Sequence, residues 1–175
     1  KNNENCKTKK ALSIDPWIDG SDANTPSDTY KSSDATDPSV KGKKTAYSNS
    51  EDLNYVKERF SKEIDDKVVN INRHFSYDIK DDFEDSYFDF IYIDATHTYE
   101  SVLSDLNDYF PKLKSDGILA GHDFIKDFPG VKKAVNQFAK ENKLKFLTSG
   151  RIIVHSKDIR GPSRHSSTDW ALARK

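Results

Sequence analysis

The segment FDFIYIDATHTY (88–99) constrains the fold more than any other part of the chain. It begins with a nearly continuous apolar and aromatic run, which is typical of a strand that is covered on both faces in a parallel sheet. The run stops at Asp94, and Thr96 and His97 follow within three positions. We therefore predict a buried parallel strand over 88–94 that ends in a carboxylate and an imidazole.

Helical and strand patterns alternate along the rest of the chain. Apolar residues recur at helical spacing in three segments, namely 50–64, 99–110 and 131–138. Further strands are predicted at 11–15, 67–75 and 117–124, followed by three closely spaced candidates at 144–150, 151–157 and 169–175. This alternation predicts an α/β fold with a mostly parallel sheet, helices on both faces and an antiparallel C-terminal strand.

Composition excludes several classes of function. The chain of 175 residues has 28 basic and 29 acidic residues, so no basic excess predicts nucleic-acid binding. No apolar run is long enough to span a membrane. The lone Cys6 offers no internal disulfide, which favours a cytoplasmic location. The length fits a single domain over 1–175, and the polar stretch 18–47 is predicted to be a long flexible loop.

Three predicted strands end in an acid, at Asp15, Asp94 and Asp123. Ligands of open α/β sheets bind at the carboxyl ends of the strands, and parallel strands bring these ends to one edge. We therefore expect the three carboxylates to converge on one site. An alternative is that each acid caps the helix that follows it.

Hard cations prefer oxygen ligands, so Asp94 and Asp123 are candidate ligands for a divalent metal such as Mg²⁺. His122 would add a nitrogen ligand, but neighbouring strand residues point to opposite faces. Both side chains reach one ion only if the strand has already ended there. His97 has two interpretations, a general base or a histidine that caps a helix or positions the substrate.

The segment 88–124 resembles the class I S-adenosylmethionine-dependent methyltransferases, and most closely the branch with macrolide-sugar O-methyltransferases and cephalosporin-hydroxylase-like proteins. The resemblance rests on IDATHTY (93–99), LKSDG (113–117) and GHDF (121–124), and it extends over 11–175. In LKSDG, Asp116 replaces a glycine of the family pattern, a mild departure because Asp tolerates left-handed geometry. The resemblance implies a Rossmann-like fold that binds S-adenosylmethionine.

The resemblance also implies roles for individual residues. ALSIDPW (11–17) resembles the second strand of the family, whose terminal acid binds the cofactor ribose; this is Asp15 here. We expect Trp17, Ser76 and Asp94 to bind the cofactor as well, with Ser76 near the adenine. The family's first strand and Gly-rich loop should precede ALSIDPW, and no such segment is found. We therefore expect a fold that is incomplete at its N-terminus, with the chain truncated at its front.

These observations predict a methyltransferase that acts on a small-molecule hydroxyl, with a sugar as one candidate acceptor. A divalent metal at Asp94, His122 and Asp123 would assist, and His97 or Asp94 itself would be the base. Two alternatives stay open. One is a degenerate Rossmann-like binding or scaffold module without catalysis, and the other is a different nucleotide-cofactor Rossmann enzyme. A homo-oligomer is also left open.

Overall fold

The computed structural model describes residues 10–17, 50–126, 128–148, 152–153, 166–167 and 169–175. The chain divides into two compact units, and among the described residues the first reaches as far as Ile79 and the second begins at Lys80. The predicted loop 18–47 lies outside the described residues, and the single domain over 1–175 stays a prediction.

The described residues of the first unit form two parallel strands and three short helices. Strand β1 (Ala11–Ile14) pairs with β2 (Val69–Asn72), and the helices are α1 (Ser50–Arg59), α2 (Ser61–Asp65) and α3 (Ser76–Ile79). The predicted helix over 50–64 is interrupted at Phe60, whose φ of −110° and ψ of 22° leave the helical region. The apolar stripe therefore continues across two helices instead of one.

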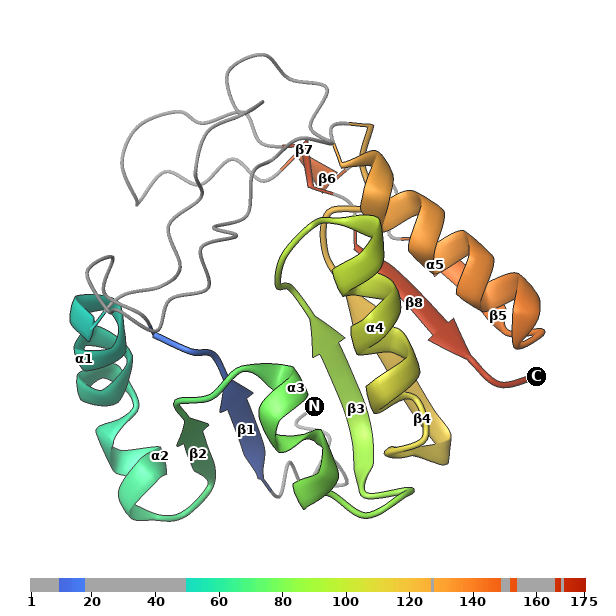
Figure 1. The fold of residues 1–175 in the computed structure, drawn as a ribbon. Helices are drawn as coiled ribbons and strands as arrows, with labels where there is room; N and C mark the ends of the chain where they lie inside the picture. Colours follow the sequence, from blue (N-terminus) through green and yellow to red (C-terminus); the bar gives the residue numbers. More distant parts are fainter. Residues whose placement is uncertain (1–9, 18–49, 127, 149–151, 154–165, 168) are drawn as a thin grey trace, which may run out of the picture. The chain divides into compact units, whose positions relative to one another are not determined.

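The second unit is built on a four-stranded sheet in the order β3-β4-β8-β5 (Figure 1). Its strands are β3 (Phe88–Ile93), β4 (Leu113–Gly121), β5 (Lys145–Thr148) and β8 (Trp170–Ala173). Strand β4 runs parallel to β3, whereas β8 is antiparallel to both of its neighbours, β4 and β5. The predicted antiparallel C-terminal strand is therefore confirmed. A short 3₁₀ helix, η1 (Lys80–Asp82), and the antiparallel pair β6 (Ile152–Ile153) and β7 (Ser166–Ser167) complete the described elements.

Strand β4 differs in its limits from the predicted strand at 117–124. It begins four residues earlier, at Leu113, and it ends at Gly121, before His122. The pairing shifts between Phe88↔Leu113 and Phe90↔Ile118, so extra residues of β4 bulge where LKSDG passes β3. The glycine in this segment therefore marks an irregularity inside the strand and not its beginning.

Helices α4 (Tyr99–Tyr109) and α5 (Pro129–Glu141) lie side by side over one face of this sheet (Figure 1). They enclose the core with alternate residues of the strands, such as Leu119 and Leu172, both 0% exposed. The apolar side chains of β3 therefore lie on both faces of the sheet. Ile91 and Ile93 pack against this core, whereas Phe90 and Tyr92 lie on the other face of the sheet and are about half exposed.

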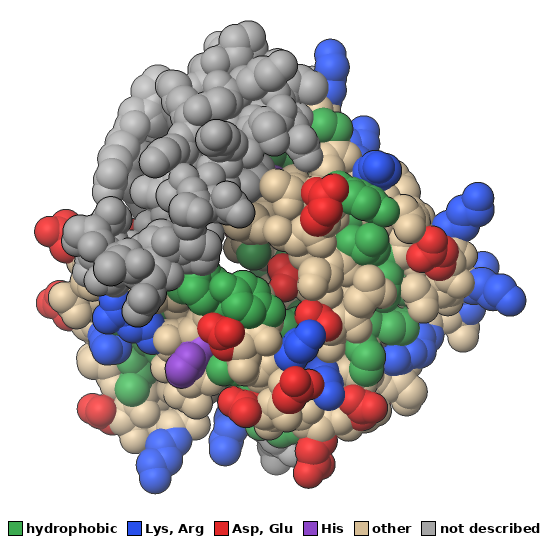
Figure 2. Space-filling model, viewed as in Figure 1, with side chains coloured by type: hydrophobic (Ala, Val, Ile, Leu, Met, Phe, Trp, Pro, Cys, Tyr) green, Lys and Arg blue, Asp and Glu red, His purple; other side chains and the backbone are tan. Residues whose placement is uncertain are grey.

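The mixed α/β architecture with a parallel β3–β4 pair confirms the predicted fold class. Within the described part of the chain, no helix is both long and apolar enough to cross a membrane. On the face visible in Figure 2, basic and acidic side chains are interspersed over the described surface. This distribution agrees with the nearly balanced charge of the sequence.

Candidate functional site

Asp94 and Asp123 follow two neighbouring parallel strands. Ile93 and Gly121 are paired residues at the carboxyl ends of β3 and β4, so the segments that leave the two strands lie next to each other. Asp123 has a φ of 59°, in the left-handed region that non-glycine residues rarely adopt. Strand β4 has ended at Gly121, before His122, which meets the condition for the His122 and Asp123 side chains to approach one point.

His97 is held between these two carboxylates. It lies in the turn before α4, where Thr98 caps the helix by accepting a hydrogen bond from the Ser101 backbone N–H at 3.2 Å. Its Nε2 is 2.8 Å from Oδ2 of Asp123 and 3.7 Å from Oδ1 of Asp94. The ring of Phe128 packs against the imidazole with 4.3 Å between ring centroids. Because Thr98 caps α4, the His97 side chain is not needed as a cap and interacts with Asp94 and Asp123.

The electrostatics of the three groups are coupled. Burial lowers the pKa of His97, but the hydrogen bonds and charges of Asp123 and Asp94 outweigh this effect and raise it to about 9. Burial raises the pKa of Asp123, but the interactions with His97 and His122 outweigh it and hold this pKa below the usual range. At neutral pH the protein alone therefore keeps an imidazolium beside ionised Asp123.

One ligand atom from each of Asp94, His97 and Asp123 lies within 4.8 Å of the others. This spacing and donor set are compatible with a divalent cation. His122 lies beside the same group, since its Nδ1 is 3.3 Å from Oδ1 of Asp123 and 3.9 Å from Oδ2 of Asp94. The structure therefore brings together the four predicted site residues that belong to the second unit.

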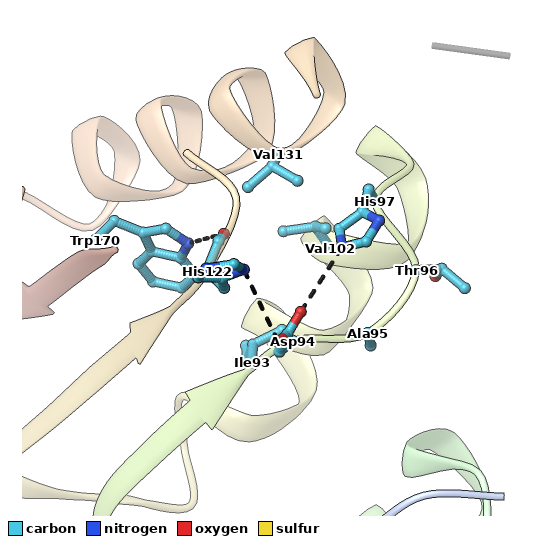
Figure 3. Close-up of a pocket in the computed structure, with 9 residues that line it drawn as sticks. All are labelled: Ile93, Asp94, Ala95, Thr96, His97, Val102, His122, Val131 and Trp170. Carbon is cyan, nitrogen blue, oxygen red and sulfur yellow. Dashed lines mark hydrogen bonds and ion pairs between the residues drawn. The ribbon is translucent and has the colours of Figure 1, made fainter. Parts of the chain in front are cut away.

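A Trp from the C-terminal strand closes the inner side of this site. The indole N–H of Trp170 donates to the backbone carbonyl of His122 at 3.0 Å. A Cβ added at Gly121 would lie 2.4 Å from the Trp170 ring and 2.4 Å from the Ile93 carbonyl oxygen, so only glycine fits beneath the indole. The small pocket in Figure 3 is lined by Ile93, Asp94, Ala95, Thr96, His97, Val102, His122, Val131 and Trp170. Local sequence patterns do not single out Trp170 as a site residue, because they carry no information about the pairing of β8 with β4.

The candidate cofactor residues Asp15, Trp17 and Ser76 lie in the first unit. The Trp17 backbone N–H donates to Oδ1 of Asp15 at 2.8 Å, and Ser76 begins α3. Arg73 donates to the Trp17 carbonyl oxygen at 2.7 Å and so ties this turn to the segment after β2. The Trp17 side chain is buried, and its indole N–H has no hydrogen-bond partner among the described residues. Convergence of Asp15 with Asp94 and Asp123 stays a prediction, because Asp15 belongs to the first unit and the other two acids belong to the second.

Solved structures with a similar fold come from several enzymes. Precorrin-6y C5,15-methyltransferase from Geobacter metallireducens matches with a TM-score of 0.55 and 16% identity over 73% of this chain and 64% of its own. The O-methyltransferase from Bacillus cereus, solved in complex with SAH, matches with a TM-score of 0.54 and 11% identity. This match covers 72% of this chain and 60% of the other. Spermidine synthase from Thermotoga maritima matches with a TM-score of 0.50 and 17% identity. This match covers 94% of this chain and 45% of the other. At these identities the likeness shows the fold alone.

The chain spans 64%, 60% and 45% of the lengths of these three structures. A search of curated proteins found no match. The family described as “Methyltransferase domain” matches residues 1–124, which include both the first unit and the two turns that carry Asp94, His97 and Asp123. The chain therefore belongs to the methyltransferase-domain family, as the resemblance of its segment 88–124 implied.

Proposed function

We propose that this chain transfers a methyl group from S-adenosylmethionine to a hydroxyl of a small molecule, with the help of a divalent cation. The observation that carries the proposal is the cluster of Asp94, His97 and Asp123 at the carboxyl ends of adjacent parallel strands. Membership of the methyltransferase-domain family supports the reaction class, and the SAH complex of the Bacillus cereus relative supports the cofactor. A sugar acceptor, a cytoplasmic location and a homo-oligomer stay predictions.

The proposed cation would be held by Asp94 and Asp123, with His122 or His97 as a nitrogen ligand. Two carboxylates suit Mg²⁺ or Mn²⁺, and an imidazole ligand shifts the preference toward Mn²⁺. A cation there would supply positive charge that lowers the pKa of a substrate hydroxyl. The interactions with His97 and His122 hold the pKa of Asp123 below its usual range, so this carboxylate is ionised at neutral pH and can bind a cation.

His97 and Asp94 are the candidates for accepting the hydroxyl proton. His97 accepts a proton only in its neutral form, and its pKa of about 9 means that the protein alone keeps it charged at neutral pH. Asp94 is half exposed, so an acceptor substrate can approach its carboxylate from solvent. Because methyl transfer is an in-line displacement, much of the rate would come from orienting the two reactants.

S-adenosylmethionine would supply the methyl group on a positively charged sulfur. Asp15 and Trp17 fit the polar part of such a cofactor, since a carboxylate accepts hydrogen bonds from ribose hydroxyls. The buried indole N–H of Trp17, which lacks a partner among the described residues, is a donor that a bound ligand would satisfy. We assign Ser76, at the start of α3, to the adenine side of the same ligand.

Metal binding tests the cluster directly. Titration of the purified protein with Mn²⁺ should show that Asp94→Asn and Asp123→Asn each weaken binding by about tenfold or more. Asp89→Asn is the matched control, because Asp89 lies near the other end of β3 and its exposed carboxylate pairs with Lys114 at 2.7 Å. Equal Mn²⁺ affinity in all four proteins would overturn the metal assignment.

Cofactor binding and turnover test the rest of the proposal. Calorimetry should detect SAH binding that Asp15→Asn weakens by about tenfold, because one hydrogen-bonding carboxylate is removed. Methyl transfer to a panel of phenols, catechols and sugars should depend on added metal. Binding of SAH without transfer to any acceptor would favour the non-catalytic binding module, and no binding would contradict the cofactor assignment.

A further inference from the structure

Asp169, just before β8, and Trp170, the first residue of β8, contact the segments that carry the candidate ligands. On the helix-covered face of the sheet, the Trp170 indole N–H donates to the His122 carbonyl at 3.0 Å. On the opposite face, the Tyr92 hydroxyl donates to Oδ1 of Asp169 at 2.8 Å. Asp169 and Trp170 therefore reach β3 and β4 from both sides, across 77 and 48 positions of sequence respectively.

The Trp170 hydrogen bond adds to the backbone hydrogen bonds of the turn that holds Asp123. The His122 N–H donates to the Ile93 carbonyl at 3.2 Å, and the Ile125 N–H donates to the Asp123 carbonyl at 2.7 Å. With its carbonyl bound by Trp170, His122, the residue before Asp123, has both of its backbone polar groups hydrogen-bonded. This matters because Asp123 adopts a φ of 59°, which costs free energy unless the surroundings impose it.

Trp170 is well placed to impose this conformation. Its side chain is 1% exposed and packs directly on Gly121, one residue before His122. The register Ile93–Gly121–Trp170 runs straight across β3, β4 and β8 at the end of the sheet. A rigid indole in this position holds the turn that follows β4 in a fixed position relative to the sheet.

The Tyr92 contact acts on the other ligand-bearing strand. Tyr92 lies two residues before Asp94, and its hydroxyl spans β4 to reach Asp169. Burial and the Asp169 carboxylate raise the pKa of Tyr92, so the hydroxyl keeps its proton and donates. The end of β3 is thereby tied to the same segment of chain as the end of β4.

We propose that Asp169 and Trp170 are positioning residues for the candidate metal site, in that they hold the turns of Asp94 and Asp123 at the spacing that one cation requires. This inference rests on the metal binding in the proposed function. Partners that orient metal ligands affect affinity by about 10- to 100-fold in known sites. The C-terminal strand would thus contribute to the site without supplying a ligand.

Two substitutions remove the hydrogen bonds and keep an aromatic ring. Trp170→Phe should weaken Mn²⁺ binding by about tenfold, and Tyr92→Phe, at a half-exposed site, by about threefold. Tyr87→Phe is the control for the second change, because it removes the same hydroxyl from an exposed Tyr just before the opposite end of β3. Phe138→Leu, in the core on α5, controls for a general loss of packing.

Hydrogen exchange in metal-free buffer provides a second measurement that does not depend on the cation. Trp170→Phe should speed exchange of the amides in residues 121–125, whereas Phe138→Leu should leave them close to wild type. Unchanged exchange in Trp170→Phe would overturn the proposal, and so would an equal loss of Mn²⁺ affinity in Phe138→Leu. A wild-type protein that fails to bind Mn²⁺ would instead refute the metal part of the proposed function. In that case, faster exchange in Trp170→Phe would still support the role of Trp170 in holding the turn of Asp123.

Discussion

At the scale of single residues, the charge of His97 governs the candidate site. Its imidazole lies between two carboxylates, 2.8 Å from Asp123 and 3.7 Å from Asp94. Without a cation, the protonated imidazole balances these negative charges. A bound cation would take over this balance, so proton and metal should compete for the site.

This coupling predicts a pH-dependent contribution of His97 to stability. The pKa of His97 is raised in the folded protein to about 9, above the unfolded value of about 6.5. The stabilisation is therefore complete below about pH 6.5 and is lost as the pH rises through about 9. In metal-free buffer, His97→Gln should lower the free energy of unfolding by about 1–2 kcal/mol more at pH 6 than at pH 10.

Urea unfolding at the two pH values measures this difference. His74→Gln, which removes an exposed imidazole of the first unit, is the control. A His97→Gln effect of the same size at both pH values would show that its ion pairs with Asp94 and Asp123 do not stabilise the fold.

At the scale of elements, the start of α5 sets the position of the His97 turn. Gly130 follows the Pro at the first position of α5 and is buried against the backbone before α4. A Cβ on Gly130 would lie 2.7 Å from both the His97 carbonyl oxygen and the Tyr99 amide nitrogen. The two helices can approach this closely at that point because residue 130 has no side chain.

Gly130→Ala therefore separates two opposing effects. Helix propensity alone would make Ala the better residue by up to about 1 kcal/mol. Overlap with the backbone of 97–99 should instead destabilise the protein by about 1–3 kcal/mol. Asn136→Ala, at an exposed position of the same helix, should change the free energy of unfolding by less than about 0.5 kcal/mol. A stabilised Gly130→Ala protein would contradict the close packing.

At the scale of the whole molecule, the last strand of the chain is an interior strand of the second unit's sheet. Strand β8 lies between β4 and β5, and Leu172 pairs with both Leu119 and Phe146. Its side chain is 0% exposed. The folding of the second unit therefore depends on residues at the end of the sequence.

Leu172→Ala should lower the free energy of unfolding by about 2–5 kcal/mol, because it leaves a cavity in the core. Leu147→Ala makes the same change on the neighbouring strand, where the side chain is 50% exposed, and should cost about 1 kcal/mol or less. Chemical denaturation of both variants measures the difference. Equal costs would mean that β8 does not form the centre of the core.

Much of the local structure could be predicted from the sequence. The apolar run before Asp94 is β3, and the stripe from Tyr99 is α4. Limits were less predictable. Phe60 interrupts an otherwise regular stripe, and the bulge at LKSDG lies inside β4, because both depend on contacts made elsewhere in the fold.

The sequence by itself determined that Asp94 and Asp123 follow strand ends, since the change from apolar to polar side chains is local. Only the tertiary structure decided what surrounds them. The left-handed turn at Asp123, the approach of His97 to both acids and the Trp170 contact across 48 positions follow from strand register and helix packing. Periodicity records which face of an element is apolar, but it carries no information about which distant element will cover that face.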